Sequence, residues 1–218
     1  MMTTITHTHK PLSGRQVAKW GLLFISQLIM SPFIILCKIE EWLSAGKSES
    51  MFSMCTHFVA LLPGMPGAFL RKGFYTLTLD FCSPDCHIGF GSLFSHRSVR
   101  VERYVYIGMY TIIGSASIGA HSLIGSRSSI ISRNALHEMG EDGHWTAYSA
   151  DSVSQTNIGE NVWIGEGSTI AANIGDRSQI GSGSVVSSDI KSGILASGNP
   201  PRFIKKIEVP AAVRSETI

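Results

Sequence analysis

Isoleucine-glycine pairs recur at a regular spacing through the second half of the chain, and this repeat constrains the fold more than any other feature. Nine Ile-Gly dipeptides occur, several times more than the abundances of the two residues predict. An aliphatic residue returns almost every six positions, at Ile107, Ile113, Ile118, Ile124, Ile130, Ile158, Ile164, Ile170, Ile174, Ile180 and Val186. Neither an amphipathic helix nor an alternating strand has this period.

A six-residue period is typical of a solenoid in which each hexapeptide makes one short strand and one turn. Three hexapeptides then complete a triangular coil of parallel sheet, and each aliphatic side chain points inward onto its counterpart in the next coil. Stiff β-branched residues suit such a stacked sheet. A glycine after the aliphatic residue, as at Gly108, Gly125 and Gly165, is expected to let the backbone turn the corner at little steric cost. The sequence therefore predicts an all-β solenoid.

Two interruptions divide the repeat. A 26-residue excursion without periodicity runs from Ser132 to Asn157, and a loop of this length between regular coils favours a functional role. The repeat ends at Ile194, and Pro200 and Pro201 are expected to forbid a further strand.

These interruptions define the expected organisation of the chain. Residues 1–80 form an apolar, partly helical region, residues 81–198 form the solenoid with an active-site loop over 132–157, and residues 199–218 form a basic C-terminal segment. The basic segment is interpreted either as a solvated terminal helix or as a phosphate-binding element.

The charge is small and unevenly distributed. Lys and Arg number 18 against 16 Asp and Glu, a net charge of +2, which argues against nucleic-acid binding by a basic face. The first 100 residues carry +4 and the remainder −2, and the mean hydropathy is +0.17. A basic, apolar front half suggests contact with an anionic membrane surface.

The cysteines do not form a recognisable metal or haem site. Cys82 and Cys86 precede His87, but a zinc site needs a second ligand pair, and c-type haem attachment needs two intervening residues rather than three. We interpret all four cysteines, which include Cys37 and Cys55, as structural or incidental and expect no metal.

Two apolar stretches lie in the front half. The first is an 18-residue run from Trp20 to Cys37, and the second, from Phe58 to Leu70, is too short to span a bilayer. Together they suggest a helical hairpin at the inner leaflet, with Arg71 and Lys72 at the headgroups. The alternatives are packing against the solenoid or a neighbouring subunit, and a single span, which would place the solenoid on the far side of the membrane from the N-terminus.

The stretch from 104 to 207 resembles the hexapeptide-repeat acyltransferases. IGENVWIGEGSTI, IGSGSVVSSDI and GNPPRFIKKI resemble the three C-terminal landmarks of the maltose, galactoside and exopolysaccharide O-acetyltransferase branch. Upstream, LLPGMPGAFLRKGFYTLTLDFC and IGFGSLFSHRSVRVERYVYIGMYTIIG resemble the leader of a bacterial subgroup tied to extracellular and capsular polysaccharide. The combined match covers roughly residues 58 to 207.

The resemblance implies a left-handed parallel β-helix that assembles as a homotrimer and uses acetyl-CoA as co-substrate in a groove between subunits. The positions that match those lining the family's groove or lying near the adenosine phosphates are Trp163, Gly165, Ser182, Ser187, Arg202 and Lys205. Arg offers phosphates a fork of donors and Lys a point charge. The alternative interpretation of Trp163 is packing at a corner of the solenoid. The alternative for Ser182 and Ser187 is that serine is common at coil corners.

The resemblance also implies a histidine base, because a sugar hydroxyl is too weakly acidic to attack a thioester unaided. The family places it at the end of a Ser-Gly-basic-basic-Gln-His run, which corresponds here to SRNALH and ends at His137; the Gly and the basic pair are absent. His144 is the rival, with a hydrogen-bonded or Trp-packed loop histidine as its plainer interpretation. His121 is expected at an outward or corner position, and Glu138, Glu141 and Asp142 are all candidates for the acidic partner.

These observations predict an O-acetyltransferase for a sugar hydroxyl of a polysaccharide or lipid-linked precursor, peripheral to the inner face of the cytoplasmic membrane. The alternatives are acetylation of a small acceptor such as an antibiotic, serine or nucleotide sugar, and a non-catalytic β-helix protein. A metal-dependent hydratase resembling γ-type carbonic anhydrases requires three histidines from adjacent coils, and His121, His137 and His144 lack that spacing.

Overall fold

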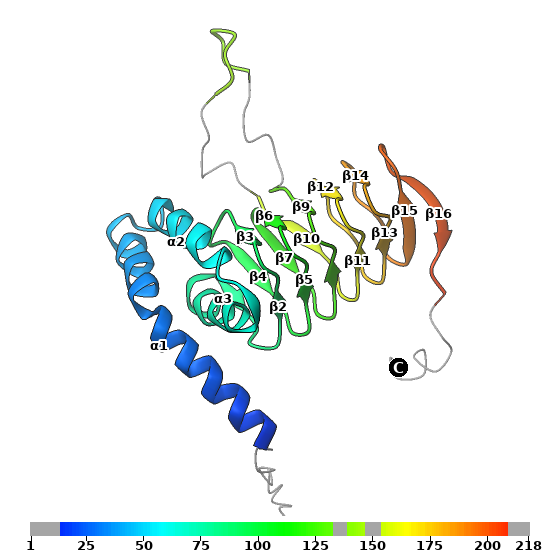
Figure 1. The fold of residues 1–218 in the computed structure, drawn as a ribbon. Coiled ribbons are helices and arrows are strands. Elements are labelled where there is room, and N and C mark those ends of the chain that lie inside the picture. Colours follow the sequence, from blue (N-terminus) through cyan, green and yellow to red (C-terminus); the bar gives the residue numbers. More distant parts are fainter. Residues whose placement is uncertain (1–13, 133–138, 147–153, 209–218) are drawn as a thin grey trace, which may run out of the picture.

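The computed structural model describes residues 14–132, 139–146 and 154–208, which form a parallel β-solenoid with three helices at its N-terminal end (Figure 1). The helices are α1 (Gly14–Leu43), α2 (Ser50–Ala60) and α3 (Gly64–Thr78). The strands are β1 (Phe81–Cys82), β2 (His87–Ile88), β3 (Leu93–Phe94), β4 (Val99–Val101), β5 (Tyr106–Ile107), β6 (Ile112–Ile113), β7 (Ala116–Ile118), β8 (Leu123–Ile124), β9 (Ser129–Ile130), β10 (Thr156–Ile158), β11 (Trp163–Ile164), β12 (Thr169–Ile170), β13 (Gln179–Ile180), β14 (Val185–Val186), β15 (Ile194–Ser197) and β16 (Arg202–Lys206). The predicted solenoid with an apolar helical extension is confirmed.

The strands stack into three sheets, one for each side of the coil. The first sheet has the order β1-β4-β7-β10, the second β16-β15-β13-β11-β8-β5-β2, and the third β14-β12-β9-β6-β3. Equivalent repeat positions are paired from coil to coil, so that Ile164 lies between Ile124 and Ile180 in the second sheet. The first sheet resumes in register after the excursion, because Ile158 of β10 pairs with Ile118 of β7.

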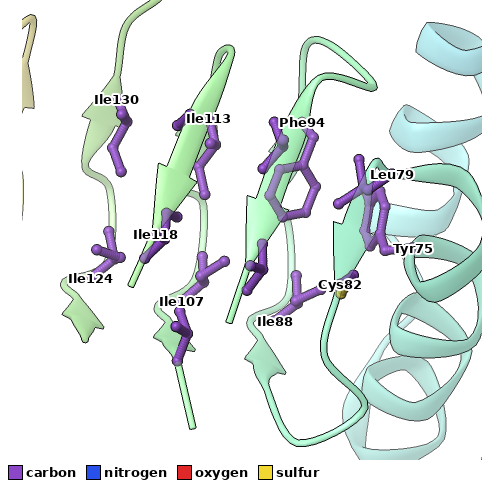
Figure 2. Close-up of a cluster of buried hydrophobic side chains, with 14 of the residues drawn as sticks. Tyr75, Leu79, Cys82, Ile88, Phe94, Ile107, Ile113, Ile118, Ile124 and Ile130 are labelled. Atoms are coloured by element: carbon purple, nitrogen blue, oxygen red, sulfur yellow. The ribbon is translucent and has the colours of Figure 1, made fainter. Parts of the chain in front are cut away.

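The predicted inward residues form buried columns along the solenoid (Figure 2). Most strands are only two residues long, with an outward first side chain and a buried second one, as in β5, β8 and β11. The inward residues Ile107, Ile124 and Ile164 are 0% exposed. Full burial of one such side chain contributes about 1.5–3 kcal/mol relative to leaving it exposed, so the stacked isoleucines dominate the stability of this region.

The repeat glycines have a different function from the one expected. Gly108, Gly125 and Gly165 do not have positive φ. A Cβ atom at Gly125 would lie 2.5 Å from the main-chain nitrogen of Glu166 in the next coil, and one at Gly165 would lie 2.4 Å from that of Ser182. Glycine is therefore required because successive coils approach closely there.

Helix α3 covers the first coil of the solenoid. The ring of Tyr75 packs edge-on against Phe94, with centroids 4.6 Å apart, and Leu79 and Cys82 belong to the same buried cluster (Figure 2). Cys82 and Cys86 are buried in this region, and their Sγ atoms are 3.6 Å apart. The first coil thus buries Phe94 and a cysteine at inward positions that isoleucine occupies in later coils.

Helix α1 is apolar on both its buried and its exposed faces. It extends through Pro32 for 30 residues, and Leu23, Met30 and Ile34 face the protein while Phe24 and Leu28 are exposed. It is long and apolar enough to cross a membrane by length and composition. A helix that is hydrophobic all round belongs in a core or in lipid.

The expected hairpin is wrong in two respects. The second apolar stretch is divided between α2 and α3, because the segment from Leu61 to Pro63 interrupts the helices. Arg71 is not at a headgroup position: it is 2% exposed, and its guanidinium donates hydrogen bonds to the main-chain oxygens of Ile88 and Leu62. Burial lowers the pKa of Arg71. Arg71 instead connects α3 to the solenoid.

The clamp, which we define as Glu40, Glu49, His96 and Arg97, joins the helices to the first coils. Arg97 pairs with Glu40, and both side chains are 8% exposed. Glu49 accepts the Arg97 main-chain N–H at 2.8 Å and contacts His96 Nδ1 at 2.7 Å. Burial by itself raises the pKa of both carboxyl groups, but their hydrogen bonds outweigh it and leave both pKa values below the usual range.

The C-terminal segment also differs from the expectation. Pro200 and Pro201 are followed by a strand, β16, which pairs antiparallel with β15 at the edge of the second sheet. The prolines do not prevent this strand because they lie in the turn between β15 and β16. The basic residues are therefore part of the same sheet as β8, β11 and β13.

Candidate active site

A surface groove of about 290 Å³ lies over the second sheet and the corner that follows it. Its lining consists of Tyr106, Leu123, Ile124, Gly125, Ser126, Trp163, Gly165, Glu166 and Ser182. Three of these, Trp163, Gly165 and Ser182, are positions that the family resemblance assigns to coenzyme binding. Trp163 and Gly165 lie on one coil and Ser182 lies on the next, where its main-chain nitrogen approaches Gly165.

The wall of the groove is a row of outward side chains. Tyr106, Leu123 and Trp163 are paired in register, and they are 45%, 45% and 52% exposed. Each is followed by a buried isoleucine, and side chains alternate across a strand, so the inward column fixes the outward row. The result is an exposed apolar surface at the centre of the sheet.

The floor of the groove is made largely of backbone. Gly125 and Gly165 lie where successive coils are too close for any side chain. Their carbonyl and amide groups belong to the coil ladder, in which Gly165 N–H donates to Ile180 O at 2.8 Å. A slender ligand can therefore come close to the main chain at this corner.

Two basic side chains lie on the same sheet beyond the groove. The register row that includes Trp163 continues through Gln179 and Leu195 to Lys205. These are three strand spacings, roughly 14 Å.

Arg202 and Lys205 share one face of β16 despite being three positions apart. The register shifts between Leu195 and Ala196, so that Lys205 pairs with Leu195 and Arg202 with Ser197. Those two partners are two residues apart on β15 and therefore lie on the same face. The irregularity places both cations toward one side of the sheet.

The remaining predicted residues lie elsewhere. Ser187 follows β14 in the third sheet and does not line the groove. His137 and Glu138 lie outside the described residues. His121 occupies a turn with φ of +62°, and its ring packs on Tyr104 at 4.8 Å, which agrees with a corner position.

His144 lies in a small exposed turn within residues 139–146. Its main-chain N–H donates to Asp142 Oδ1 at 3.0 Å, and its Nδ1 lies 3.1 Å from the main-chain oxygen of Asp142. The side chain is 83% exposed. This geometry agrees with the plainer interpretation of His144 as a hydrogen-bonded loop histidine.

Sequence reasoning did not single out Glu166, which lines the groove. Its carboxylate pairs with Arg127 Nη2 at 3.2 Å, and both side chains are well exposed. The signal was the position directly after Gly165, where a side chain leaves the corner next to the groove. Glu166 makes this end of the groove unfavourable for an anionic group, in contrast to the basic end at β16.

Comparison with known proteins identifies the repeat and the fold. Residues 155–188 match a family model described as a hexapeptide repeat of succinyl-transferase. No curated protein is significantly similar to the chain in sequence. The hexapeptide repeat predicted from the isoleucine spacing is confirmed.

Solved structures extend the similarity to most of the chain. A maltose O-acetyltransferase from Clostridium difficile 630 has a TM-score of 0.63 at 23% identity, covering 78% of this chain and 90% of that one. A hexapeptide-repeat acetyltransferase from Vibrio cholerae has a TM-score of 0.56 at 19% identity, covering 74% and 91%. A galactoside acetyltransferase in complex with coenzyme A has a TM-score of 0.52 at 21% identity, covering 73% and 81%. At these identities, the similarity shows a shared fold.

Proposed function

We propose that this chain is an acetyl-CoA-dependent O-acetyltransferase that modifies a sugar hydroxyl of an extracellular or capsular polysaccharide or of its precursor. The observation that carries the proposal is that Trp163, Gly165 and Ser182, which the family resemblance assigns to coenzyme binding, line one groove. The similar fold of a galactoside acetyltransferase in complex with coenzyme A supports the same ligand.

The two ends of the second sheet fit the two ends of acetyl-CoA. The glycine floor and apolar wall suit the thin pantetheine arm. At β16, Arg202 supplies a planar fork of donors and Lys205 a point charge for the phosphates. We place the thioester at the Trp163 end, because Glu166 would repel phosphate there.

We propose direct transfer with His137 as general base. The neutral imidazole of His137 takes the proton of the acceptor hydroxyl while its oxygen attacks the thioester carbonyl. Main-chain N–H groups stabilise the oxyanion. The C–S bond then breaks, the acetyl ester forms, and the thiolate leaving group recovers the proton from the imidazolium of His137. A positioned base of this kind contributes about 10²–10⁴-fold to the rate.

The proposed assembly is a homotrimer. The apolar side chains of Tyr106, Leu123 and Trp163 are about half exposed, and an exposed apolar patch commonly marks an interaction surface. A neighbouring subunit that covered this row would turn the open groove into an enclosed one. Closure would also exclude water from the thioester.

We further propose that the enzyme is cytoplasmic and peripheral to the inner face of the membrane. The exposed face of α1 is apolar over residues 20 to 36, and the first acidic residue of the chain is Glu40, preceded by Lys10, Arg15, Lys19 and Lys38. A basic, apolar segment of this type favours an anionic lipid surface. The membrane would bring the enzyme to lipid-linked acceptors, which a small-molecule acetyltransferase does not need.

The decisive experiment measures acetyl transfer from acetyl-CoA to candidate glycans with purified wild type, His137→Ala and His144→Ala. The expected result is a loss of about 10²-fold or more in kcat for His137→Ala with an unchanged Kd for coenzyme A, and nearly full activity for His144→Ala. Full activity of His137→Ala would refute the base assignment. The absence of coenzyme A binding by the wild type would refute the proposed activity itself.

A further inference from the structure

A second concave site, which we call the hollow, lies where the helices meet the first coils. Its volume is about 550 Å³, within the range of about 300–1,000 Å³ usual for small-ligand sites. Its lining consists of Glu41, Gly46, Lys47, Glu49, Asp80, His96, Arg97, Ser98, Ser115 and Gln155. The hollow is thus lined almost entirely by polar side chains, unlike the apolar wall of the groove.

Part of this lining belongs to the clamp. Arg97 Nη1 donates to the main-chain oxygen of Ser48 at 2.8 Å, and Glu49 contacts His96 and the Arg97 main chain. Arg97 Nε is buried and has no hydrogen-bond partner within the described part of the chain. Because Arg97 Nε is fully buried and the guanidinium lies over the Phe52 ring, the clamp supplies a fixed polar wall to the hollow rather than a free donor.

Other groups in the hollow are open to a ligand. The side chains of Asp80 and Lys47 make no hydrogen bond or ion pair among the residues that the structure describes. Burial raises the pKa of Asp80, because its carboxylate is partly removed from water and no donor compensates. A carboxylate in this condition accepts hydrogen bonds from hydroxyl groups.

The charges of the hollow select the kind of ligand. Glu41 pairs with Lys38, Arg97 with Glu40, and Glu49 contacts His96. The charged groups of the lining that remain without a partner in the described chain are Asp80 and Lys47. A phosphate or a sugar acid placed against Asp80 would be repelled by its carboxylate. A neutral, hydroxyl-rich ring would donate hydrogen bonds to the Asp80 carboxylate and accept them from the Lys47 ammonium group.

The hollow is also connected to the excursion that carries His137 in the sequence. Gln155, at the end of the excursion, lines the hollow and donates from Nε2 to the main-chain oxygen of Ser98 at 3.1 Å. One end of the excursion is therefore anchored on the hollow.

We infer that the hollow binds a neutral sugar ring of the acceptor, with Asp80 as a principal hydrogen-bond acceptor for its hydroxyl groups. This inference rests on the proposed O-acetyltransferase function and narrows its substrate class. It excludes sialic or uronic acid residues as the ring bound at this position.

The experiment uses saturation-transfer difference NMR on the full-length protein. The probes are the methyl glycosides of glucose, galactose, fucose and N-acetylglucosamine, with glucuronate and glucose 1-phosphate as anionic counterparts. Wild type is compared with Asp80→Asn and with Glu160→Gln, a matched loss of an exposed carboxylate outside the hollow. Because the Asp80 carboxylate bonds to nothing in the described chain, Asp80→Asn should fold normally, and thermal melting checks this.

The expected result is binding of at least one neutral glycoside to wild type and Glu160→Gln, a loss of about tenfold or more in affinity for Asp80→Asn, and no binding of the anionic probes. Unchanged affinity in Asp80→Asn, equal binding of anionic probes, or the absence of any glycoside binding would overturn the inference.

Kinetic measurements distinguish failure of the hollow from failure of the proposed acetyltransferase function. If Asp80→Asn transfers acetyl groups with an unchanged KM for the acceptor, only the proposed sugar site in the hollow is rejected. If sugar binding depends on Asp80 but the wild type transfers no acetyl group, only the proposed acetyltransferase function is rejected.

Discussion

The solenoid and helix α1 are both rich in aliphatic residues, but they place them differently. In β6, Ile113 is fully buried while its neighbour Ile112 is 48% exposed, and the two faces of each strand have separate roles. In α1, Leu28 is 65% exposed although Met30, two residues later, is 4% exposed. The solenoid's inward isoleucines are explained by the protein's own core, whereas the outward residues of α1 need a surface beyond the described chain.

The regions also differ in the forces that join them. Neighbouring coils are joined by repeated local contacts between equivalent residues. The helices are joined to the coils by Tyr75 on Phe94 and by a few charged residues that are far apart in sequence, above all Glu40 and Arg97. A substitution in the clamp should therefore destabilise the contact between the helices and the first coils. A substitution of an inward isoleucine should destabilise the coils that pack around it.

The largest expected effect comes from Arg97→Met. This change leaves Glu40 as a buried charge without its partner, which costs about 3–5 kcal/mol in the free energy of unfolding. Hydrogen-exchange mass spectrometry should show loss of protection over residues 37–52 and little change over 158–180.

Arg127→Met is the matched control, because it removes an exposed ion pair worth less than about 1 kcal/mol. The double variant Arg97→Met with Glu40→Leu should recover part of the loss, since it removes the stranded charge. Equal stability of Arg97→Met and Arg127→Met would contradict the described role of the clamp.

The next largest effect is expected for Ile113→Ala. Removing a fully buried isoleucine from a column costs about 2–5 kcal/mol, because the surrounding coils cannot collapse into the space. Ile112→Ala in the same strand changes only an exposed side chain and should cost less than about 1 kcal/mol. Chemical denaturation of the two variants measures the difference, and similar losses would mean that the inward and outward assignments are wrong.

The sequence predicts the regular parts of this molecule because they are local. A six-residue period identifies the inward residues from Ile107 to Val186, and stacking of the coils brings Trp163 and Gly165 of one coil to the same groove as Ser182 of the next. The first coil was less evident, because Cys82, Ile88 and Phe94 keep the spacing but differ in residue type. The period thus predicts the coils that share one residue type better than the coil that meets the helices.

The features that the sequence does not predict depend on non-local or irregular geometry. Glu40 and Arg97 meet across 57 residues, and the common face of Arg202 and Lys205 depends on a register shift that has no sequence signal. Arg71 follows an apolar stretch, which favours a headgroup position, but in the structure two main-chain oxygens accept its hydrogen bonds in the interior. The hollow is missed for the same reason, since its residues come from separate parts of the chain.

Acid should weaken the clamp before it weakens the coils. The pKa values of Glu40 and Glu49 lie below their ordinary value of 4.5 in the folded chain. A carboxyl group with a lowered folded pKa stabilises the fold at higher pH, and this contribution is lost as the pH falls below about 4.5 and through the folded pKa.

Hydrogen exchange measured from pH 7 downward, corrected for intrinsic rates, should therefore show earlier opening of residues 37–52 than of the columns. The variant with Arg97→Met and Glu40→Leu should have a flatter pH dependence in this segment. Simultaneous opening of both regions would show that the clamp is not a separate acid-sensitive boundary.

The smallest effect on stability, and the sharpest test of the comparison, is expected for Leu28→Gln in α1. Gln is a good helix former and residue 28 is exposed, so the free energy of unfolding should change by no more than about 0.5 kcal/mol. Met30→Gln, on the buried face, should cost about 2–5 kcal/mol by the same measurement.

If the exposed face of α1 lies in lipid, however, Leu28→Gln removes a side chain whose burial is worth about 1.5–3 kcal/mol. Its affinity for vesicles of anionic phospholipid, measured by co-flotation, should then fall about tenfold or more, although its stability in solution is unchanged. Unaltered vesicle binding by Leu28→Gln would mean that another protein surface, and not lipid, covers this face of α1.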